Sequence, residues 1–165
     1  MARLIDIDHG ESILRIFILF TQTARAVLKY TDAHFYNETR LSTIKFIVLQ
    51  VLASNNGVMT PSDIAEWTQT ERHNITALVK RMRRDGLVTA ERNSSDKRVV
   101  NITLTNKGRE VLSRAMPAAK EIVSQVMLSI PEGDAALLEK QLSVLRENAH
   151  HALEGFAHGS RVQPG

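Results

Sequence analysis

The sequence predicts a mainly helical fold with a small β-hairpin near the middle of the chain. Long segments toward both ends repeat apolar residues every three or four positions, which is the period of an α-helix. Between them, Val100, Ile102 and Leu104 alternate with Asn101 and Thr103, as the residues of a half-buried strand do. The chain has 165 residues, of which 43% are hydrophobic and 24% charged. These values are ordinary for a globular protein that can bury a core.

The first two helices are expected over residues 11–35 and 42–53. Both segments carry apolar side chains at helical spacing, and the first is interrupted by few charges. The second should end at Asn55-Asn56-Gly57, because Asn and Gly tolerate the left-handed conformation that closes helices.

A short third helix is predicted over residues 61–67. Thr60 suits its N-cap, and Asp63 follows at the position where a carboxylate favours a helix N-terminus. The residues that can face inward are Ile64, Ala65 and Trp67.

A fourth helix follows after a very short turn and should end at Gly86. Its apolar residues form one stripe that must face the core, and they are Ile75, Leu78, Val79 and Met82. Two helices joined by such a turn make a helix-turn-helix. Strands over 87–92 and 99–104, joined by a polar loop, follow directly, so the arrangement is a winged helix-turn-helix.

Two further helices are expected at the C-terminal end. Thr105 should cap one that runs over 106–129, and the other should run over 134–156 after the break at Pro131. The last residues, 158–165, are expected to form a flexible tail. The N-terminal helix and these two helices are too apolar to be satisfied within a domain of this size, so we expect them to pack against another chain.

Composition excludes several classes of protein. The chain has no cysteine, which excludes disulfides, thiolate metal sites and thiol-based catalysis. The apolar run Ile13–Phe20 contains Arg15 and is far too short to span a bilayer, and no signal-peptide pattern is present. We therefore expect a cytoplasmic protein without a membrane segment. No phosphate-binding glycine loop or nucleophile motif indicates an enzyme, and no cofactor is expected.

Charge is unevenly distributed, although the formal net charge is only +3. Bases outnumber acids over residues 71–98, whereas acids outnumber bases over residues 110–155. A solvated helix face would explain the basic excess. Because it coincides with a helix-turn-helix, a nucleic-acid-binding surface is the sharper interpretation.

The segment from Leu78 to Gly108 resembles the winged helix of MarR-type (multiple antibiotic resistance regulator) transcription factors. The resemblance rests on Gly86-Leu87-Val88 after the recognition helix, Asp96-Lys97-Arg98 in the wing and Leu104-Thr105-Asn106-Lys107-Gly108 at the next helix. Asn74-Ile75-Thr76 also fits the recognition helix of that family. Ser95 stands where the family often has proline, which should change the stiffness of the wing.

The resemblance implies a homodimer that binds double-stranded DNA at palindromic operators, most simply as a repressor released by a small molecule. It divides the chain into an N-terminal dimerisation helix (1–40), a winged helix-turn-helix (41–108), C-terminal dimerisation helices (109–157) and the tail (158–165).

DNA contacts are expected from the recognition helix and the elements beside it. Arg72 could contact guanine and Asn74 adenine, with His73 beside them, while Thr76 and Lys80 are more suited to phosphates. The alternative is that His73 and Asn74 only cap the helix. The first turn of the preceding helix, which Pro61 and Ser62 begin, is expected to present backbone N–H groups to a phosphate.

The wing residues Ser95, Asp96, Lys97 and Arg98 are expected to reach the flanking minor groove. There the negative potential attracts a guanidinium, and the resemblance suggests that Asp96 pairs with Arg98 to orient it. The alternative for this segment is a solvated turn, since Asn, Ser and Asp are common in turns.

The resemblance also predicts that a small molecule regulates the protein. The resemblance implies a small aromatic or anionic effector, and candidate contacts lie where the first two helices meet: Tyr30, His34, Tyr36, Arg40 and Lys45. Packing and surface roles explain these residues equally well.

Two alternatives remain open. A metal-responsive regulator could use His150, His151 and His158 with Glu147 and Glu154, but zinc sites need three or four convergent ligands. A winged helix used for protein contacts would bind DNA weakly and with little dependence on salt.

Overall fold

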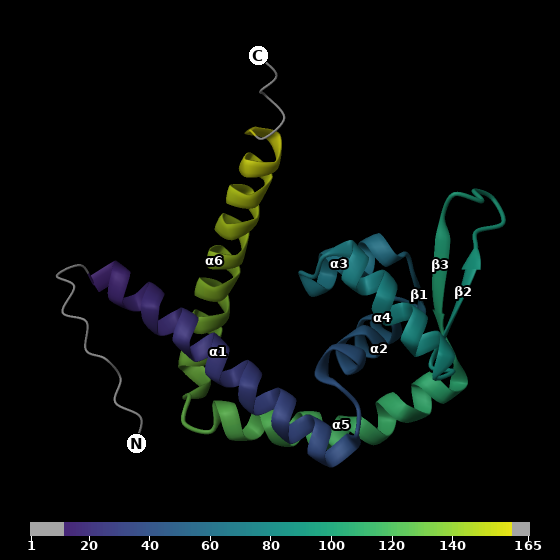
Figure 1. Cartoon of the computed structure of the whole chain (residues 1–165). Coiled ribbons are helices and arrows are strands. Elements are labelled where there is room, and N and C mark those ends of the chain that lie inside the picture. Colours follow the sequence, from purple (N-terminus) through teal and green to yellow (C-terminus); the bar gives the residue numbers. More distant parts are fainter. Residues whose placement is uncertain (1–11, 160–165) are drawn as a thin grey trace. The chain divides into compact units, whose positions relative to one another are not determined.

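The computed structural model describes residues 12–159 and divides between Val126 and Met127 into two units, which we describe separately (Figure 1). The first unit holds all the strands and every helix but the last. Its elements are α1 (Ser12–Thr39), α2 (Thr43–Ser54), β1 (Val58–Met59), α3 (Pro61–Thr68), α4 (Arg72–Arg84), β2 (Val88–Arg92), β3 (Val100–Leu104) and α5 (Asn106–Met127), whose final residue crosses the division. The second unit consists of α6 (Glu132–Gly159) and the residues that lead into it.

The sheet is antiparallel and has the strand order β1-β3-β2, with β2 and β3 extending as the wing (Figure 1). In β2 and β3, Val88 pairs with Leu104 and Arg92 with Val100. The strand β1 was not predicted, and it pairs Met59 with Ile102. Two residues are too short to show an alternating pattern, so the sequence gives no signal for this strand.

The helix ends that the sequence marks are formed as predicted. Asn56 and Gly57 adopt positive φ angles of 57° and 81° after α2. The Thr60 hydroxyl accepts a hydrogen bond from the Asp63 amide, and the Asp63 carboxylate accepts one from the Thr60 amide, both at 3.2 Å. This capping box fixes the residue at which α3 begins.

The core lies where α2, α3, α4 and the sheet meet. The predicted stripe of α4 is buried along its whole length, at Ile75, Leu78, Val79 and Met82. It packs in one cluster with Ile64, Leu49, Leu52 and Ile102, among others. Burial of one face leaves the basic face of α4 toward solvent, which confirms the amphipathic interpretation.

One inward-facing residue was predicted wrongly. Ile64 and Ala65 are buried, but Trp67 is 58% exposed. At about 100° per residue, the buried direction of α3 lies between Ile64 and Ala65, and Trp67 points about 110° away from it. In a helix of only eight residues, a large apolar side chain is a weak guide to the buried face.

Several helix boundaries differ from the expected ones. α1 continues to Thr39, and α6 begins at Glu132 because the Pro131 carbonyl accepts bonds from the Asp134 and Ala135 amides. α6 reaches Gly159, so the first two residues of the expected tail are helical. Glu11 and residues 160–165 lie outside the described residues.

Large apolar side chains are exposed on α1 and on α6. On α1, Ile13, Ile16, Phe17 and Leu28 are each at least 60% exposed, and Phe35 is the residue of that helix that the core buries. On α6, Leu137 and Leu153 are 58% and 64% exposed. Surfaces of this kind mark protein contacts. No helix in residues 12–159 is long and apolar enough to cross a bilayer.

Candidate nucleic-acid interface

The wing loop is a turn held by two of its own side chains. Asn93 Oδ1 accepts hydrogen bonds from the amides of Ser95 and Asp96, at 2.8 and 3.2 Å. Asp96 Oδ1 accepts from the Arg98 amide at 2.9 Å and from Arg98 Nε at 3.3 Å. The predicted pairing of Asp96 with Arg98 is therefore present. It restrains an arginine whose side chain is 92% exposed.

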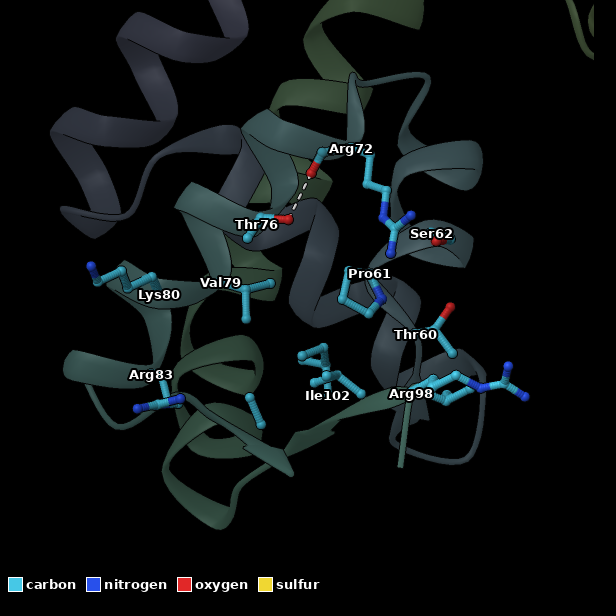
Figure 2. Close-up of a pocket in the computed structure, with 13 residues that line it drawn as sticks. Thr60, Pro61, Ser62, Arg72, Thr76, Val79, Lys80, Arg83, Arg98 and Ile102 are labelled. Carbon is cyan, nitrogen blue, oxygen red and sulfur yellow. Dashed lines mark hydrogen bonds between the residues drawn. The ribbon is translucent and has the colours of Figure 1, made fainter. Parts of the chain in front are cut away.

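A groove of about 520 Å³ lies between the recognition helix α4, the start of α3 and the wing (Figure 2). It brings together six of the predicted DNA contacts: Pro61, Ser62, Arg72, Thr76, Lys80 and Arg98. These residues come from three elements spread over nearly forty positions of sequence. Their convergence follows from the packing of α3 on α4 and of α4 on β2.

The groove has an apolar floor and a basic rim. Val79, Ala90, Val99, Val100 and Ile102 line the floor, while the cations around it are Arg72, Lys80, Arg83 and Arg98. Figure 2 shows Lys80 and Arg83 on one side and Arg98 on the other. This arrangement suits a polyanion that runs across α4 toward the wing.

Arg83 was not among the predicted DNA contacts, although it lines the groove. With Arg72, Thr76 and Lys80 it follows the spacing i, i+4, i+8, i+11, which places all four on one side of a helix. That spacing could have identified Arg83 from the sequence. The acid at the end of the same helix, Asp85, makes its ion pair with Lys45.

The predicted residues that do not line the groove are His73, Asn74, Ser95, Asp96 and Lys97. His73 and Asn74 are exposed in the first turn of α4, about 100° and 200° around the helix from Arg72. Neither of them caps α4 with a side-chain hydrogen bond, because the N-cap is Glu71 and no such bond is made there. Both side chains are therefore open to solvent at the end of the recognition helix.

Hydrogen-bond chemistry limits how the first turn of α3 and the Thr76 hydroxyl could make their predicted phosphate contacts. Pro61 has no N–H, and the Asp63 amide is engaged by Thr60, so Ser62 supplies the open amide of this turn. The Thr76 hydroxyl donates to the Arg72 carbonyl at 2.9 Å (Figure 2). A phosphate only accepts hydrogen bonds, so Thr76 would have to release this bond to hold one.

The basic residues of α4 make no ion pair with a carboxylate in the described part of the chain. Within residues 12–159, the one cation of α4 or the wing that makes an ion pair with a carboxylate is Arg98. Lys80, Arg81, Arg83 and Arg84 line a second hollow of about 290 Å³ on the same helix. Cations gathered without acidic partners raise the local positive potential that attracts nucleic acid.

The five effector candidates take part in three contacts, and one of these is with Asp85, which is not an effector candidate. The rings of Tyr30 and His34 stack with centroids 5.5 Å apart, and the Arg40 guanidinium lies 5.9 Å from the ring centre of Tyr36. These two pairs belong to the end of α1. Lys45 instead binds Asp85, at the end of α4, with 2.7 Å between Nζ and Oδ2.

The Asp85 carboxyl has a pKa below its ordinary value of 3.8. The hydrogen bond from Lys45 is the main cause, and the charges of Arg84 and Lys107 act in the same direction. Partial burial opposes the shift but does not cancel it.

Among the described residues, His150 and His151 do not form part of a metal site. His151 Nδ1 lies 3.7 Å from Glu154. In the part of the chain that the structure describes, no three His, Cys, Asp or Glu residues converge on a point that could hold a metal ion. Side chains beyond residue 156, including that of His158, are outside that part.

A helix-turn-helix followed by a β-hairpin wing, with a basic recognition helix, defines a winged helix-turn-helix DNA-binding protein. The MarR family model matches residues 41–99, from the start of α2 to the end of the wing loop. The chain is 33% identical over 147 residues to the transcriptional activatory protein BadR of Rhodopseudomonas palustris, which covers 87% of this chain and 83% of BadR. It is 26% identical over 143 residues to the HTH-type transcriptional repressor YetL of Bacillus subtilis, covering 86% and 84%. The chain belongs to the MarR family of transcriptional regulators.

Solved structures share this fold. The organohalide-sensing regulator RdhR-CbdbA1625, in its 2,4-dichlorophenol-bound form, has a TM-score of 0.73 and 26% identity, covering 90% of this chain and 89% of that one. Sco3205 of Streptomyces coelicolor, a MarR family regulator in complex with DNA, has a TM-score of 0.77 and 20% identity, covering 82% and 86%. The mainly helical winged fold predicted from the sequence is thereby confirmed.

Proposed function

We propose that this chain is a homodimeric repressor that binds palindromic double-stranded DNA through α4 and the wing and is released by a small molecule. The groove between α4 and the wing carries this proposal, because four cations from two elements surround one continuous surface. A helix fits the major groove of B-DNA, and a wing beside it reaches the adjacent minor groove.

The residues divide by the part of DNA that each would contact. Arg72, His73 and Asn74 stand in the first turn of α4, the part that reaches base edges in this docking mode. Lys80, Arg83 and the Ser62 amide are suited to phosphates. In the wing, Lys97 and Arg98 would enter the minor groove, with Asp96 orienting Arg98 and Ser95 completing the turn.

The dimer follows from the apolar surfaces. The exposed side chains of α1 and α6 are too many and too large for a helical protein that stays a monomer. A two-fold dimer presents two recognition helices related by symmetry, so its target should be a palindrome. The relatives include both a repressor and an activatory protein, and we favour repression because DNA binding alone is sufficient for it.

The proposed regulation requires a binding site for a small molecule. RdhR-CbdbA1625, which shares the fold, binds 2,4-dichlorophenol. We assign an aromatic or anionic effector to the end of α1, where Tyr30, His34, Tyr36 and Arg40 supply rings and a cation. Lys45 was also a candidate, but its ion pair with Asp85 engages it elsewhere. A regulator of this kind acts without catalysis, and in the cytoplasm, where its DNA target lies.

Selection of duplexes from a random-sequence library by the full-length protein tests the proposal. We expect a palindrome to be enriched and its affinity to fall steeply as salt rises, because bound counterions are released from the phosphates. Arg72→Ala and Arg98→Ala should both weaken binding, whereas Lys120→Ala, an exposed lysine on α5, serves as the matched control. If no sequence is enriched and the variants match the wild type, the winged helix does not serve DNA binding.

A further inference from the structure

Three helices of the first unit are tied together at the C-terminal end of the recognition helix. Asp85 is the C-cap residue of α4. Its carboxylate binds the ammonium of Lys45, from α2, at 2.7 Å. Its backbone carbonyl accepts a hydrogen bond from the ammonium of Lys107, from α5, at 2.8 Å. We call these three residues the Asp85 clamp.

The backbone next to the clamp is closely packed. The Thr105 hydroxyl shares its one hydrogen between the carbonyls of Gly86 and Leu87, at 2.8 and 3.0 Å, and accepts from the Gly108 amide at 3.0 Å. A Cβ atom on Gly108 would lie 2.2 Å from the Leu87 carbonyl oxygen. The first turn of α5 is therefore fixed against the link between α4 and β2, and the Asp85 clamp extends this joint to α2.

An aspartate is an unfavourable choice at this place unless it has a specific role. The C-terminus of a helix carries a partial negative charge, which repels a carboxylate. An acid on the recognition helix also opposes the attraction of DNA. The Asp85 side chain is 37% exposed and that of Lys45 only 23%, so the pair is partly withdrawn from solvent. Its geometry is that of a charge-assisted hydrogen bond, which is stronger and more directional than a neutral one.

We propose that Lys45 and Asp85 are positioning residues for DNA binding, which set the orientation of the recognition helix α4 relative to α2. Neither residue touches DNA. Lys107 provides the corresponding tie to α5 through the Asp85 backbone. The inference rests on the proposed DNA-binding function and deepens it. It also gives Lys45 a role other than that of an effector contact.

Asp85→Asn removes the charge of the pair and leaves at most a weaker, neutral hydrogen bond to Lys45. It is a discriminating variant because two explanations predict changes in DNA affinity of opposite sign. Removing an acid near bound DNA should tighten binding if Asp85 acts only through its charge. The positioning role predicts weaker binding to the selected palindrome, by about three- to fivefold, if the pair contributes the roughly 1 kcal/mol of a well-formed exposed ion pair. Glu91→Gln is the matched control, since it removes an exposed acid from β2 and should leave binding unchanged or tighter. Asp85→Asn behaving like Glu91→Gln would overturn the proposal.

Lys45→Met, alone and combined with Asp85→Asn, tests whether the two residues act through each other. The double variant should bind no more weakly than either single variant, because either change alone already removes the ion pair. Lys45→Met should also keep the wild-type salt dependence, whereas loss of a direct phosphate contact would lower the slope by about 0.9. Additive losses, or a lowered slope, would show that Lys45 contacts DNA and is not a positioning residue.

Hydrogen exchange tests the clamp without DNA. The Asp85 amide donates to the Arg81 carbonyl and the Leu87 amide to the Met82 carbonyl, so both report on the last turn of α4. Exchange at these amides should accelerate in Asp85→Asn and Lys45→Met and stay unchanged in Glu91→Gln. Unchanged exchange in all variants would overturn the clamp itself. Accelerated exchange in a protein that selects no palindrome would keep the clamp but reject the DNA-binding function on which the positioning role depends.

Discussion

Arg98 and Asp96 are joined twice at the tip of the wing, since Asp96 Oδ1 accepts from both the backbone amide and the Nε atom of Arg98. The first bond, at 2.9 Å, shapes the turn, and the second, at 3.3 Å, directs the side chain. Exposed ion pairs contribute little to stability, so we propose that this pair serves to orient Arg98.

Two substitutions at Asp96 should distinguish the effect of its charge on DNA affinity from its effect on the orientation of Arg98. Asp96→Asn keeps an oxygen that can accept both bonds, so DNA affinity should stay near the wild-type value or rise slightly as an acid is lost. Asp96→Ala removes the acceptor, and affinity should fall several-fold because Arg98 is no longer restrained. Arg98→Ala should cost roughly tenfold, with a salt slope lower by about one contact. Fluorescence anisotropy with the selected palindrome over a salt series measures all three. Equal affinities for Asp96→Asn and Asp96→Ala would contradict an orienting role.

The two glycines Gly108 and Gly133 offer a matched test of packing at helix starts. A Cβ on Gly108 would lie 2.2 Å from the Leu87 carbonyl oxygen, while one on Gly133 would have nothing within 4 Å. Gly108→Ala should therefore destabilise the fold by about 1–3 kcal/mol through overpacking. Gly133→Ala should instead stabilise α6 by about 0.4–1 kcal/mol, because alanine has less freedom to lose on folding.

Urea denaturation at one fixed protein concentration measures the effects of the two glycine substitutions, since the apparent stability of a dimer depends on concentration. The midpoints should move in opposite directions. A Gly108→Ala variant as stable as the wild type would mean that α5 does not pack closely on the link between α4 and β2.

The stabilisation from Asp85 should depend on pH. Its pKa is lowered in the folded protein, mainly by the Lys45 hydrogen bond, so the contribution is fully present above the ordinary value of 3.8. It is lost as the pH falls through the lower pKa of the folded state. The difference in unfolding free energy between the wild type and Asp85→Asn should be below about 1 kcal/mol at neutral pH, because the pair is partly exposed.

Denaturation of the wild type and Asp85→Asn from pH 7 down into the acid range measures this difference. We expect it to shrink below the ordinary pKa, with Glu91→Gln showing no comparable change. A difference that persists unaltered into strong acid would show that Asp85 stabilises the fold by its shape and not by its charge.

The sequence predicted elements that depend on local periodicity and missed those that depend on distant partners. The buried stripe of α4 was predicted correctly because its apolar residues repeat over three turns. α3 is a short helix, and the inward orientation of Trp67 was wrong because few positions define its buried face. Strand β1 has two residues and exists only because β3 lies beside it.

In the candidate site, too, the features that depend on neighbouring residues were predicted and those that depend on distant residues were missed. The pairing of Asp96 with Arg98 was predicted through the resemblance of the wing to MarR-type regulators, and the structure contains it. The ion pair of Lys45 with Asp85 joins residues forty positions apart, and either lysine or aspartate alone is an ordinary surface residue. The apolar floor of the groove was also missed, because Ala90 and Ile102 come from different strands and meet only through their pairing.

The exposed apolar face of α1 should be a dimer contact, and one charge placed on it should separate the subunits. Phe17 is 60% exposed although it is large and aromatic. Phe17→Asp would bury a carboxylate in an apolar interface, which costs several kcal/mol when no partner is present. We expect a monomer in light scattering and a large loss of affinity for the palindrome, because a single winged helix reaches only one half-site. Gln22→Asp introduces the same carboxylate at an exposed polar position of α1 and should remain dimeric. A Phe17→Asp protein that stays dimeric and binds DNA normally would show that α1 does not form the interface through this face, and the apolar surface of α6 would then be the place to test next.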